Sequence, residues 1–158
     1  MEHCRTASPD DIPRLVDLAR ELRHELSDMR GGTLWADRDA APEPLDAAFT
    51  AWIADPAALV LAGCIDDVII GIAVVQVEPL RDGSRLGVVR ELYVEEAARS
   101  VGVGEAMTDR IVEFCRAHDC IGVDAVALPG HRETKNFFEE QGFTARALTM
   151  HTSLHGPA

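Results

Sequence analysis

The chain has 158 residues, of which 47% are hydrophobic and 27% are charged, as in ordinary globular proteins. Its formal net charge of −12 argues against a nucleic-acid-binding surface, which needs a basic face. No apolar run approaches the ~20 residues that span a membrane, and the first residues lack the basic and apolar regions of a signal peptide. We therefore expect one domain over residues 1–158, located in the cytoplasm, with neither a nucleic-acid nor a membrane partner.

A short strand and two helices are expected in the first third of the chain. Residues 3–7 fit a strand, and Ser8-Pro9-Asp10-Asp11 then resembles a helix start, with a capping serine and acids at the positive end. Apolar residues at helical spacing predict a helix that ends before Gly31-Gly32. Residues 28–43 form a long connection with weak periodicity, and residues 44–54 resume a helical pattern. These segments carry aromatic residues that either line a pocket or fill the core: Trp35, Phe49 and Trp52.

The middle of the chain reads as consecutive strands. Residues 58–65, 68–78 and 85–94 are apolar runs separated by turns, which predicts antiparallel neighbours. Residues 104–118 then have the clearest helical pattern, followed by a predicted strand over residues 123–128. Because a helix joins this strand to the previous one, we expect the two to pair in parallel.

A short helix and two closing strands complete the prediction. The helix covers residues 132–141, and Gly142 is well placed as the residue that terminates it. The closing strands are expected at residues 143–146 and 147–154. The order β, α, α, β, β, β, α, β, α, β, β predicts an α/β protein with a central mixed, mostly antiparallel sheet flanked by helices.

The loop from Arg99 to Ala106 has the features of a phosphate-binding site. It follows a strand, contains Gly102 and Gly104, and opens a helix. A helix start offers unpaired backbone N–H groups and the positive end of the helix dipole, and glycines let a ligand approach the backbone. This loop therefore predicts a cradle for the pyrophosphate of a coenzyme. The four cysteines form no CxxC pair and are expected to be free thiols rather than metal ligands: Cys4, Cys64, Cys115 and Cys120.

Two segments resemble motifs of the Gcn5-related N-acetyltransferases (the GNAT family). The run Glu91-Leu92-Tyr93-Val94, followed by Arg99-Ser100-Val101-Gly102-Val103-Gly104-Glu105-Ala106, is similar to the family's coenzyme motif. Residues 136–143 are similar to its late helix ending in Gly-Phe, and the element order fits over residues 2–154. The resemblance implies the family fold, acetyl-coenzyme A (acetyl-CoA) as acetyl donor, a primary amine as acceptor, direct attack of the amine, and often a homodimer.

The resemblance also implies how the coenzyme is held. The backbone N–H groups of residues 101–106 would bind the pyrophosphate, with a charge contact from Arg99. A bulge would splay the preceding strand, so that the backbone of Leu92 and Val94 pairs with the pantetheine arm. His131 would contact this arm or cap a helix, and Asn136 would contact the coenzyme or lie on the surface. The implied coenzyme-binding residues are Leu92, Val94, Arg99, Ser100, Val101, Gly102, Val103, Gly104, Glu105, Ala106, His131, Asn136 and Phe138.

Glu91 and Tyr93 are the residues on which we expect the chemistry to depend. An amine must lose a proton to attack, and family members often have an acid at the position of Glu91. The alternatives are that Glu91 pairs with a neighbour such as Arg90, and that Glu25 binds the amine. The usual proton-donating tyrosine aligns with Phe138, which has no hydroxyl. Water or another donor would then serve, and the candidate donors are Tyr93, Ser100 and His131.

Two other functions fit parts of the sequence. Gly102-Val103-Gly104 could begin a dinucleotide-binding GxGxxG motif, but Met107 stands where the third glycine belongs. The absent tyrosine at Phe138 instead suggests a coenzyme A-binding sensor or interaction module with weak or no catalysis. The acidic balance favours a small cationic amine as the acceptor of an enzyme.

Overall fold

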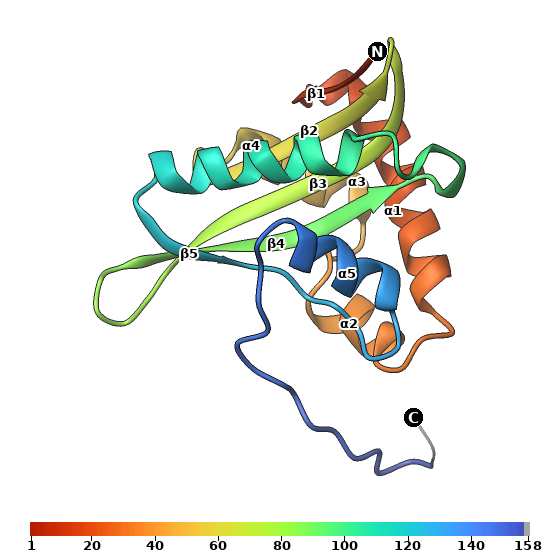
Figure 1. Cartoon of the computed structure of the whole chain (residues 1–158), viewed down its shortest axis with the longest axis vertical. Coiled ribbons are helices and arrows are strands. Elements are labelled where there is room, and N and C mark those ends of the chain that lie inside the picture. Colours follow the sequence, from red (N-terminus) through yellow and green to blue (C-terminus); the bar gives the residue numbers. More distant parts are fainter. Residues whose placement is uncertain (157–158) are drawn as a thin grey trace.

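A five-stranded sheet in the order β1-β2-β3-β4-β5 forms the centre of the computed structural model, which describes residues 1–156 (Figure 1). Strands β1 to β4 pair antiparallel, whereas β5 runs parallel to β4 because a helix connects the two. The mixed sheet with flanking helices confirms the expected fold class. The strands are β1 (Glu2–Thr6), β2 (Ala58–Ile65), β3 (Val68–Pro79), β4 (Arg85–Val94) and β5 (Cys120–Asp124).

Helices cover both faces of the sheet. Helices α1 and α3 share one hydrophobic cluster with the sheet, and α4 shares a second cluster on the opposite face (Figure 1). Helix α4 approaches closely because Gly63 on β2 has no side chain, and a Cβ there would lie 2.5 Å from Val103. The helices are α1 (Ile12–Leu26), α2 (Gly32–Arg38), α3 (Leu45–Ala54), α4 (Val103–Ala117) and α5 (Arg132–Glu140), with 3-10 turns at Pro9–Asp11 and Glu96–Ala98.

Three sequence predictions of secondary structure are wrong. Helix α2 forms inside the connection of residues 28–43, where the packing of Trp35 against the core overrides the weak periodicity. Strand β5 covers Cys120–Asp124 instead of residues 123–128, because β4 pairs with β5 only from Arg85 to Val88. The closing strands at residues 143–146 and 147–154 are absent, since this segment has no neighbouring strand in the described part of the chain.

The predicted end of α5 is confirmed. Gly142 adopts a φ of 89°, and its N–H donates to the carbonyl of Glu139 at 3.0 Å. The next N–H, of Phe143, donates back to Phe138 at 2.9 Å, so the last carbonyls of the helix are satisfied. Within residues 1–156, none of the helices is long and apolar enough to cross a membrane.

Candidate active site

A bulge at Arg90 opens the sheet at the site. Val89 lies opposite Val75 on β3 and Glu91 lies opposite Val74, so Arg90 is an extra residue on β4. Beyond Val88, β4 and β5 no longer pair, and the outer edge of residues 89–94 faces no strand in the described structure. The bulge and the splayed strand agree with what the family resemblance implied. An open backbone edge of this kind can bind an extended ligand as an added strand.

A cavity of about 480 Å³ lies in this opening. Its walls come from α1, α2, the splayed part of β4, the loop before α4, the segment after β5, and α5. Trp35 lines the cavity, as one reading of the sequence proposed. Phe49 does not: it is fully buried in the core, with its ring packed edge-on against Trp52 at 5.9 Å. Of the three aromatic residues that the sequence offered as pocket or core residues, Trp35 alone lines this cavity.

The loop before α4 presents a row of unused backbone donors. Ser100 and Gly102 have positive φ angles of 71° and 93°, which turn the chain sharply into the helix. The N–H groups of residues 100–105 donate to no acceptor in the described structure, whereas that of Ala106 donates to the carbonyl of Gly102 at 3.0 Å. Ala106 is thus the one member of the predicted N–H set whose donor is already used. Convergent N–H groups at the positive end of a 15-residue helix suit an anion such as pyrophosphate.

Gly104 lets α5 pack against this loop. A Cβ at Gly104 would lie 3.3 Å from the ring of Phe137 on α5, a tighter approach than side chains normally make. Because Phe137 and Gly104 both line the cavity, the same glycine sets its width between α4 and α5.

Arg99 is held by acidic side chains on two helices. Its guanidinium donates to Glu25 on α1 at 2.7 Å and to Glu133 on α5 at 3.1 Å, and its Nε donates to the Val94 carbonyl at 2.9 Å. The guanidinium also lies 5.4 Å from the centre of the Tyr93 ring. Arg99 therefore ties the cavity walls together here, and its contact with a coenzyme phosphate stays a prediction.

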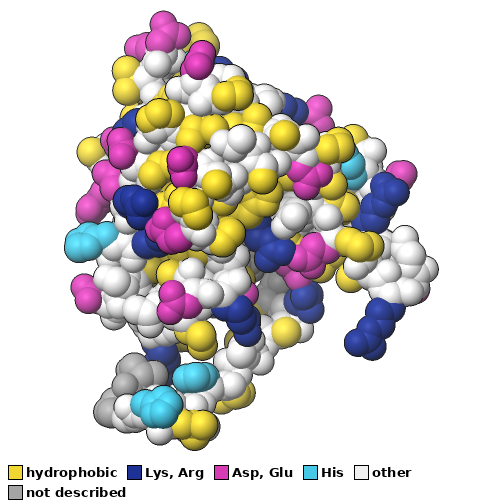
Figure 2. Space-filling view, turned by 180° about the vertical axis from the view of Figure 1, so that it is seen from behind, with side chains coloured by type: hydrophobic (Ala, Val, Ile, Leu, Met, Phe, Trp, Pro, Cys, Tyr) yellow, Lys and Arg dark blue, Asp and Glu magenta, His cyan; other side chains and the backbone are white. Residues whose placement is uncertain are grey.

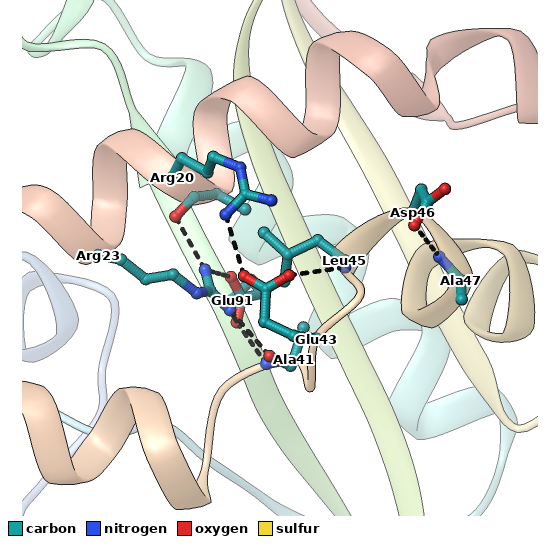
Figure 3. Close-up of polar contacts among 9 residues, drawn as sticks. Arg20, Arg23, Ala41, Glu43, Leu45, Asp46, Ala47 and Glu91 are labelled. Carbon is teal, nitrogen blue, oxygen red and sulfur yellow. Dashed lines mark hydrogen bonds and ion pairs between the residues drawn. The ribbon is translucent and has the colours of Figure 1, made fainter.

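Glu91 is one of the residues that border the cavity, and its carboxylate forms a buried ion pair with Arg23 (Figure 3). Its carboxylate accepts hydrogen bonds from Arg23 Nη1 at 2.9 Å and from the Ala41 N–H at 3.1 Å. The side chain of Glu91 is 0% exposed, and that of Arg23 is 16% exposed. Burial raises the pKa of the Glu91 carboxyl, against the opposing effects of Arg23 and the Ala41 N–H. A raised pKa makes this carboxylate a better proton acceptor.

Sequence reasoning missed the partners of Glu91. Arg90, one alternative partner that the sequence offered, instead contacts Gln76 and Glu78 on β3. Arg23 follows buried Ala19 by four residues on α1, and its Nη1 also donates to the Ala19 carbonyl at 2.8 Å. A cation in line with the apolar face of a helix was the available signal.

Tyr93 faces the same cavity from the next position but one on β4. It is buried, and its ring lies against the Arg99 guanidinium. Burial raises the pKa of the Tyr93 hydroxyl, the acids Glu21 and Glu25 raise it further, and Arg99 opposes them. The hydroxyl therefore stays protonated at neutral pH and can act as a donor.

The predicted residues of α5 divide between the cavity and the helix packing. His131 lies in the cavity wall, with Nδ1 2.9 Å from the Thr134 hydroxyl and Nε2 3.9 Å from Glu25. Asn136 is exposed at the rim. Phe138 also borders the cavity and is buried, with its ring centre 5.1 Å from that of Phe143, so the position aligned with the family's tyrosine supplies an apolar ring.

All four cysteines are free thiols. Within residues 1–156, no group of three or more His, Cys, Asp or Glu side chains is arranged to hold a metal ion.

Comparison with known families identifies the class of protein. The model of the acetyltransferase (GNAT) family matches residues 19–143, which include β4, the donor loop, α4 and all of α5. The chain therefore belongs to the GNAT acetyltransferase family, as its motifs indicated. No curated protein matches its sequence.

Solved structures share the fold at low sequence identity. A putative acetyltransferase from Agrobacterium tumefaciens is 19% identical, with a TM-score of 0.73, over 95% of this chain and 98% of that one. A predicted acetyltransferase from Clostridium acetobutylicum, solved with acetyl-CoA, is 18% identical, with a TM-score of 0.70, over 98% and 97%. Glucosamine-6-phosphate N-acetyltransferase from Arabidopsis thaliana is 16% identical, with a TM-score of 0.70, over 98% and 99%.

Proposed function

We propose that this protein is an acetyl-CoA-dependent N-acetyltransferase that acetylates a primary amine by direct attack. The observation that carries the proposal is the row of free N–H groups at residues 100–105, placed beside the open edge of β4 and above one cavity. The free N–H groups suit a pyrophosphate, and the open strand edge suits an extended chain with amide groups. In acetyl-CoA the pyrophosphate is joined directly to such a chain, the pantetheine arm. A neighbour in fold from Clostridium acetobutylicum was solved with acetyl-CoA, which supports the same coenzyme here.

The residues that would hold acetyl-CoA follow from these contacts. The N–H groups of residues 101–105 bind the pyrophosphate, and the edges of Leu92 and Val94 pair with the pantetheine arm. The Val94 carbonyl already accepts one hydrogen bond from the Arg99 Nε, and its second lone pair can accept an amide N–H of the coenzyme. When bound, acetyl-CoA supplies a thioester whose carbonyl carbon an uncharged amine can attack.

In this proposal one carboxylate binds the amine and a second accepts its proton. Glu25 is the more exposed of the two and holds the cationic amine at the cavity wall. Glu91 borders the cavity and burial raises its pKa, so it is the proposed acceptor of the amine proton. Because its side chain is fully buried, the carboxylate must become accessible to the amine or to a water before it can accept that proton. This assignment predicts that Glu25→Gln raises the KM for the amine, whereas Glu91→Gln lowers kcat and leaves the Kd of acetyl-CoA unchanged. Unchanged kcat in folded Glu91→Gln protein would remove Glu91 as the base.

Tyr93 is the proposed donor to the departing sulfur. It is the only tyrosine in the chain, its ring lines the cavity, and its raised pKa keeps the hydroxyl protonated. Ser100 and His131, which also line the cavity, are the other two candidates. A coenzyme A thiol leaves tolerably without an acid, so the loss of any one donor is expected to slow turnover without abolishing it.

The proposed acceptor is a small cationic amine. Acids outnumber bases among the cavity residues, with Glu25, Glu91, Glu133, Glu105 and Glu140 against two arginines, Arg90 and Arg99. The net charge of −12 adds a long-range attraction for cations.

A coenzyme A-binding module without catalysis is the second candidate, and Phe138 is the observation that favours it. Thiol release from acetyl-CoA in the presence of an amine panel distinguishes the two. Turnover with any amine supports the enzyme, whereas tight coenzyme binding without turnover over a broad panel supports the module.

We further propose that residues 1–158 constitute one acetyltransferase domain that works in the cytoplasm. Coverage of nearly the whole chain by single solved acetyltransferase structures supports the first statement. Four free thiols, which suit a reducing compartment, support the second.

A further inference from the structure

One side of the cavity is an apolar surface that carries a single carboxylate. Leu22, Glu25 and Leu26 lie three and four residues apart on α1, so they share one face of the helix, and all three line the cavity. Trp35 on α2 and Leu128, after β5, line it as well. The four apolar residues of this surface, called the apolar wall below, pack in one hydrophobic cluster: Leu22, Leu26, Trp35 and Leu128.

The apolar wall lies on the face of the sheet where the proposed chemistry takes place. Tyr93 belongs to the same hydrophobic cluster, and strand alternation puts Glu91 on the same face of β4. Leu92 and Val94 instead pack with α4 on the opposite face, and the donor loop opens that helix. A coenzyme held by the donor loop and by the edge of β4 therefore leaves the apolar wall to the acceptor.

Two glycines fix the wall by bringing α2 close to its neighbours. A Cβ at Gly32 would lie 1.8 Å from the Leu26 carbonyl oxygen, so only glycine lets α2 begin directly against the end of α1. At Gly31 a Cβ would lie 3.7 Å from Leu128 Cδ2, so the same turn also touches the segment after β5. The wall is thus built from three separate parts of the chain that meet at one turn.

Within residues 1–156, Glu25 offers a ligand on this side a carboxylate oxygen that is not in use. Its Oε1 accepts a hydrogen bond from Arg99 at 2.7 Å, whereas its Oε2 accepts none and lies 3.9 Å from His131 Nε2. Glu91 is fully buried and paired with Arg23. The remaining acids that line the cavity lie on α4 and α5: Glu105, Glu133 and Glu140. A ligand at the apolar wall therefore meets one available carboxylate.

The end of the chain does not cover the wall. None of the described residues 142–156 borders the cavity. They leave α5 and run away from the sheet (Figure 1), and the opposite view shows them as a separate lobe below the body (Figure 2). The apolar wall therefore faces the cavity without a cover from this segment.

We propose that the acceptor is a primary amine with one positive charge and one apolar group, an alkyl chain or an aromatic ring. This inference rests on the proposed function and narrows its acceptor. The reacting nitrogen, as an ammonium, binds Glu25 Oε2, and the apolar group packs against the apolar wall. A second ammonium would lie against Leu22, Trp35 or Leu128, where it loses hydration without gaining a carboxylate. The wall therefore selects against polyamines.

A series of amines tests the proposal on the wild-type chain. Pentylamine and 1,4-diaminobutane have the same length and differ only in a terminal methyl group against a second ammonium. In a thiol-release assay with acetyl-CoA at one pH, we expect kcat/KM to be at least about tenfold higher for pentylamine. From ethylamine to pentylamine, kcat/KM should rise by up to about fourfold for each methylene that the wall buries.

A charge placed in the wall gives a second test. Leu128 is partly buried and lies outside helix and strand, so Leu128→Glu adds a carboxylate to the wall without changing a helix. This variant should lower the preference for pentylamine over 1,4-diaminobutane by about tenfold. Leu34→Glu is the matched control, because Leu34 is 47% exposed on α2 and does not line the cavity. It makes the same change of charge and should keep the wild-type preference.

The outcomes separate this inference from the proposed function. Equal use of pentylamine and 1,4-diaminobutane, or no rise from ethylamine to pentylamine, overturns the apolar acceptor and leaves the acetyltransferase standing. An equal loss of preference in Leu34→Glu and Leu128→Glu assigns the selection to overall charge and also overturns it. Absence of thiol release with every amine refutes the proposed function, and this inference with it. The wild-type series does not depend on the folding of any variant.

Discussion

Removal of Arg23 should reveal how strongly the buried ion pair under the cavity stabilises the fold. Arg23→Ala leaves the Glu91 carboxylate, whose side chain is 0% exposed, without its cation. Breaking one partner of a buried pair typically costs about 3–5 kcal/mol, because the remaining charge is desolvated and unpaired. For a chain of this size, about 2–4 °C of Tm per kcal/mol converts this into a Tm lowered by about 6–20 °C.

Arg20→Ala is the matched control for Arg23→Ala. Arg20 lies one helical turn earlier on α1 and pairs with Glu43 at 2.9 Å, but both side chains are more than half exposed (Figure 3). An exposed pair contributes about 0–1 kcal/mol, so this variant should unfold close to wild type. Urea and thermal unfolding of both variants, followed by circular dichroism, measure the difference.

The pH dependence of Arg23→Ala provides a further check. Without Arg23, burial raises the folded-state pKa of Glu91 further above its unfolded value. A carboxyl whose pKa is higher in the folded than in the unfolded protein stabilises the fold at pH values below its unfolded pKa. This contribution to the free energy of unfolding is lost as the pH rises through the folded-state pKa. The deficit of the variant against wild type should therefore shrink from neutral pH toward pH 4. Equal destabilisation by Arg23→Ala and Arg20→Ala, at every pH, would refute the burial argument.

Three other changes test separate parts of the site and fold. Gly102→Ala forces a side chain into a backbone with a φ of 93°, which costs about 1–2 kcal/mol of strain. Calorimetry should show that this variant binds acetyl-CoA about tenfold more weakly. Gly83→Ala, at a φ of 89° in the β3–β4 turn, is the control and should leave the Kd of acetyl-CoA unchanged. Tyr93→Phe should lower kcat in a thiol-release assay without changing the KM of either substrate, and an unaltered kcat would exclude Tyr93 as the proton donor. Arg5 holds the pKa of Asp11 at about 2, below its usual value, so the stability from this pair is present above pH ~4 and is lost as pH falls through 2. Asp11→Asn should therefore flatten the decline of unfolding free energy between pH 4 and 2, and a slope equal to that of wild type would contradict this assignment.

The sequence predicted those parts of the fold whose structure depends on neighbours nearby in the chain. The α4 helix and its glycine loop could be predicted because apolar spacing and unpaired helix-start donors are local properties. The strands from Ala58 to Val94 could be predicted because each pairs with the next one in the chain. The strands predicted at residues 143–146 and 147–154 are absent from the structure, since an alternating pattern does not supply the neighbouring strand that such a segment needs.

The site was predictable in its backbone and less so in its side chains. The family motif placed the donor loop and the splayed strand, and both are present in the structure. The pairing of Glu91 with Arg23 and Ala41 joins β4, α1 and the segment before α3 across 68 and 50 residues of sequence. The spacing of Arg23 on α1 shows that it lies in line with the apolar face of the helix, but not which distant residue it meets, and the neighbouring Arg90 pairs with Glu78 instead.

The most direct test of the proposed function is thiol release from acetyl-CoA by the purified full chain, measured across a panel of small amines. We expect turnover that requires both acetyl-CoA and an amine, is fastest with small cationic acceptors, and falls in Glu91→Gln while the Kd of acetyl-CoA is unchanged. Acetyl-CoA binding with no thiol release above the protein-free rate for any amine would contradict the proposal that this protein is an N-acetyltransferase.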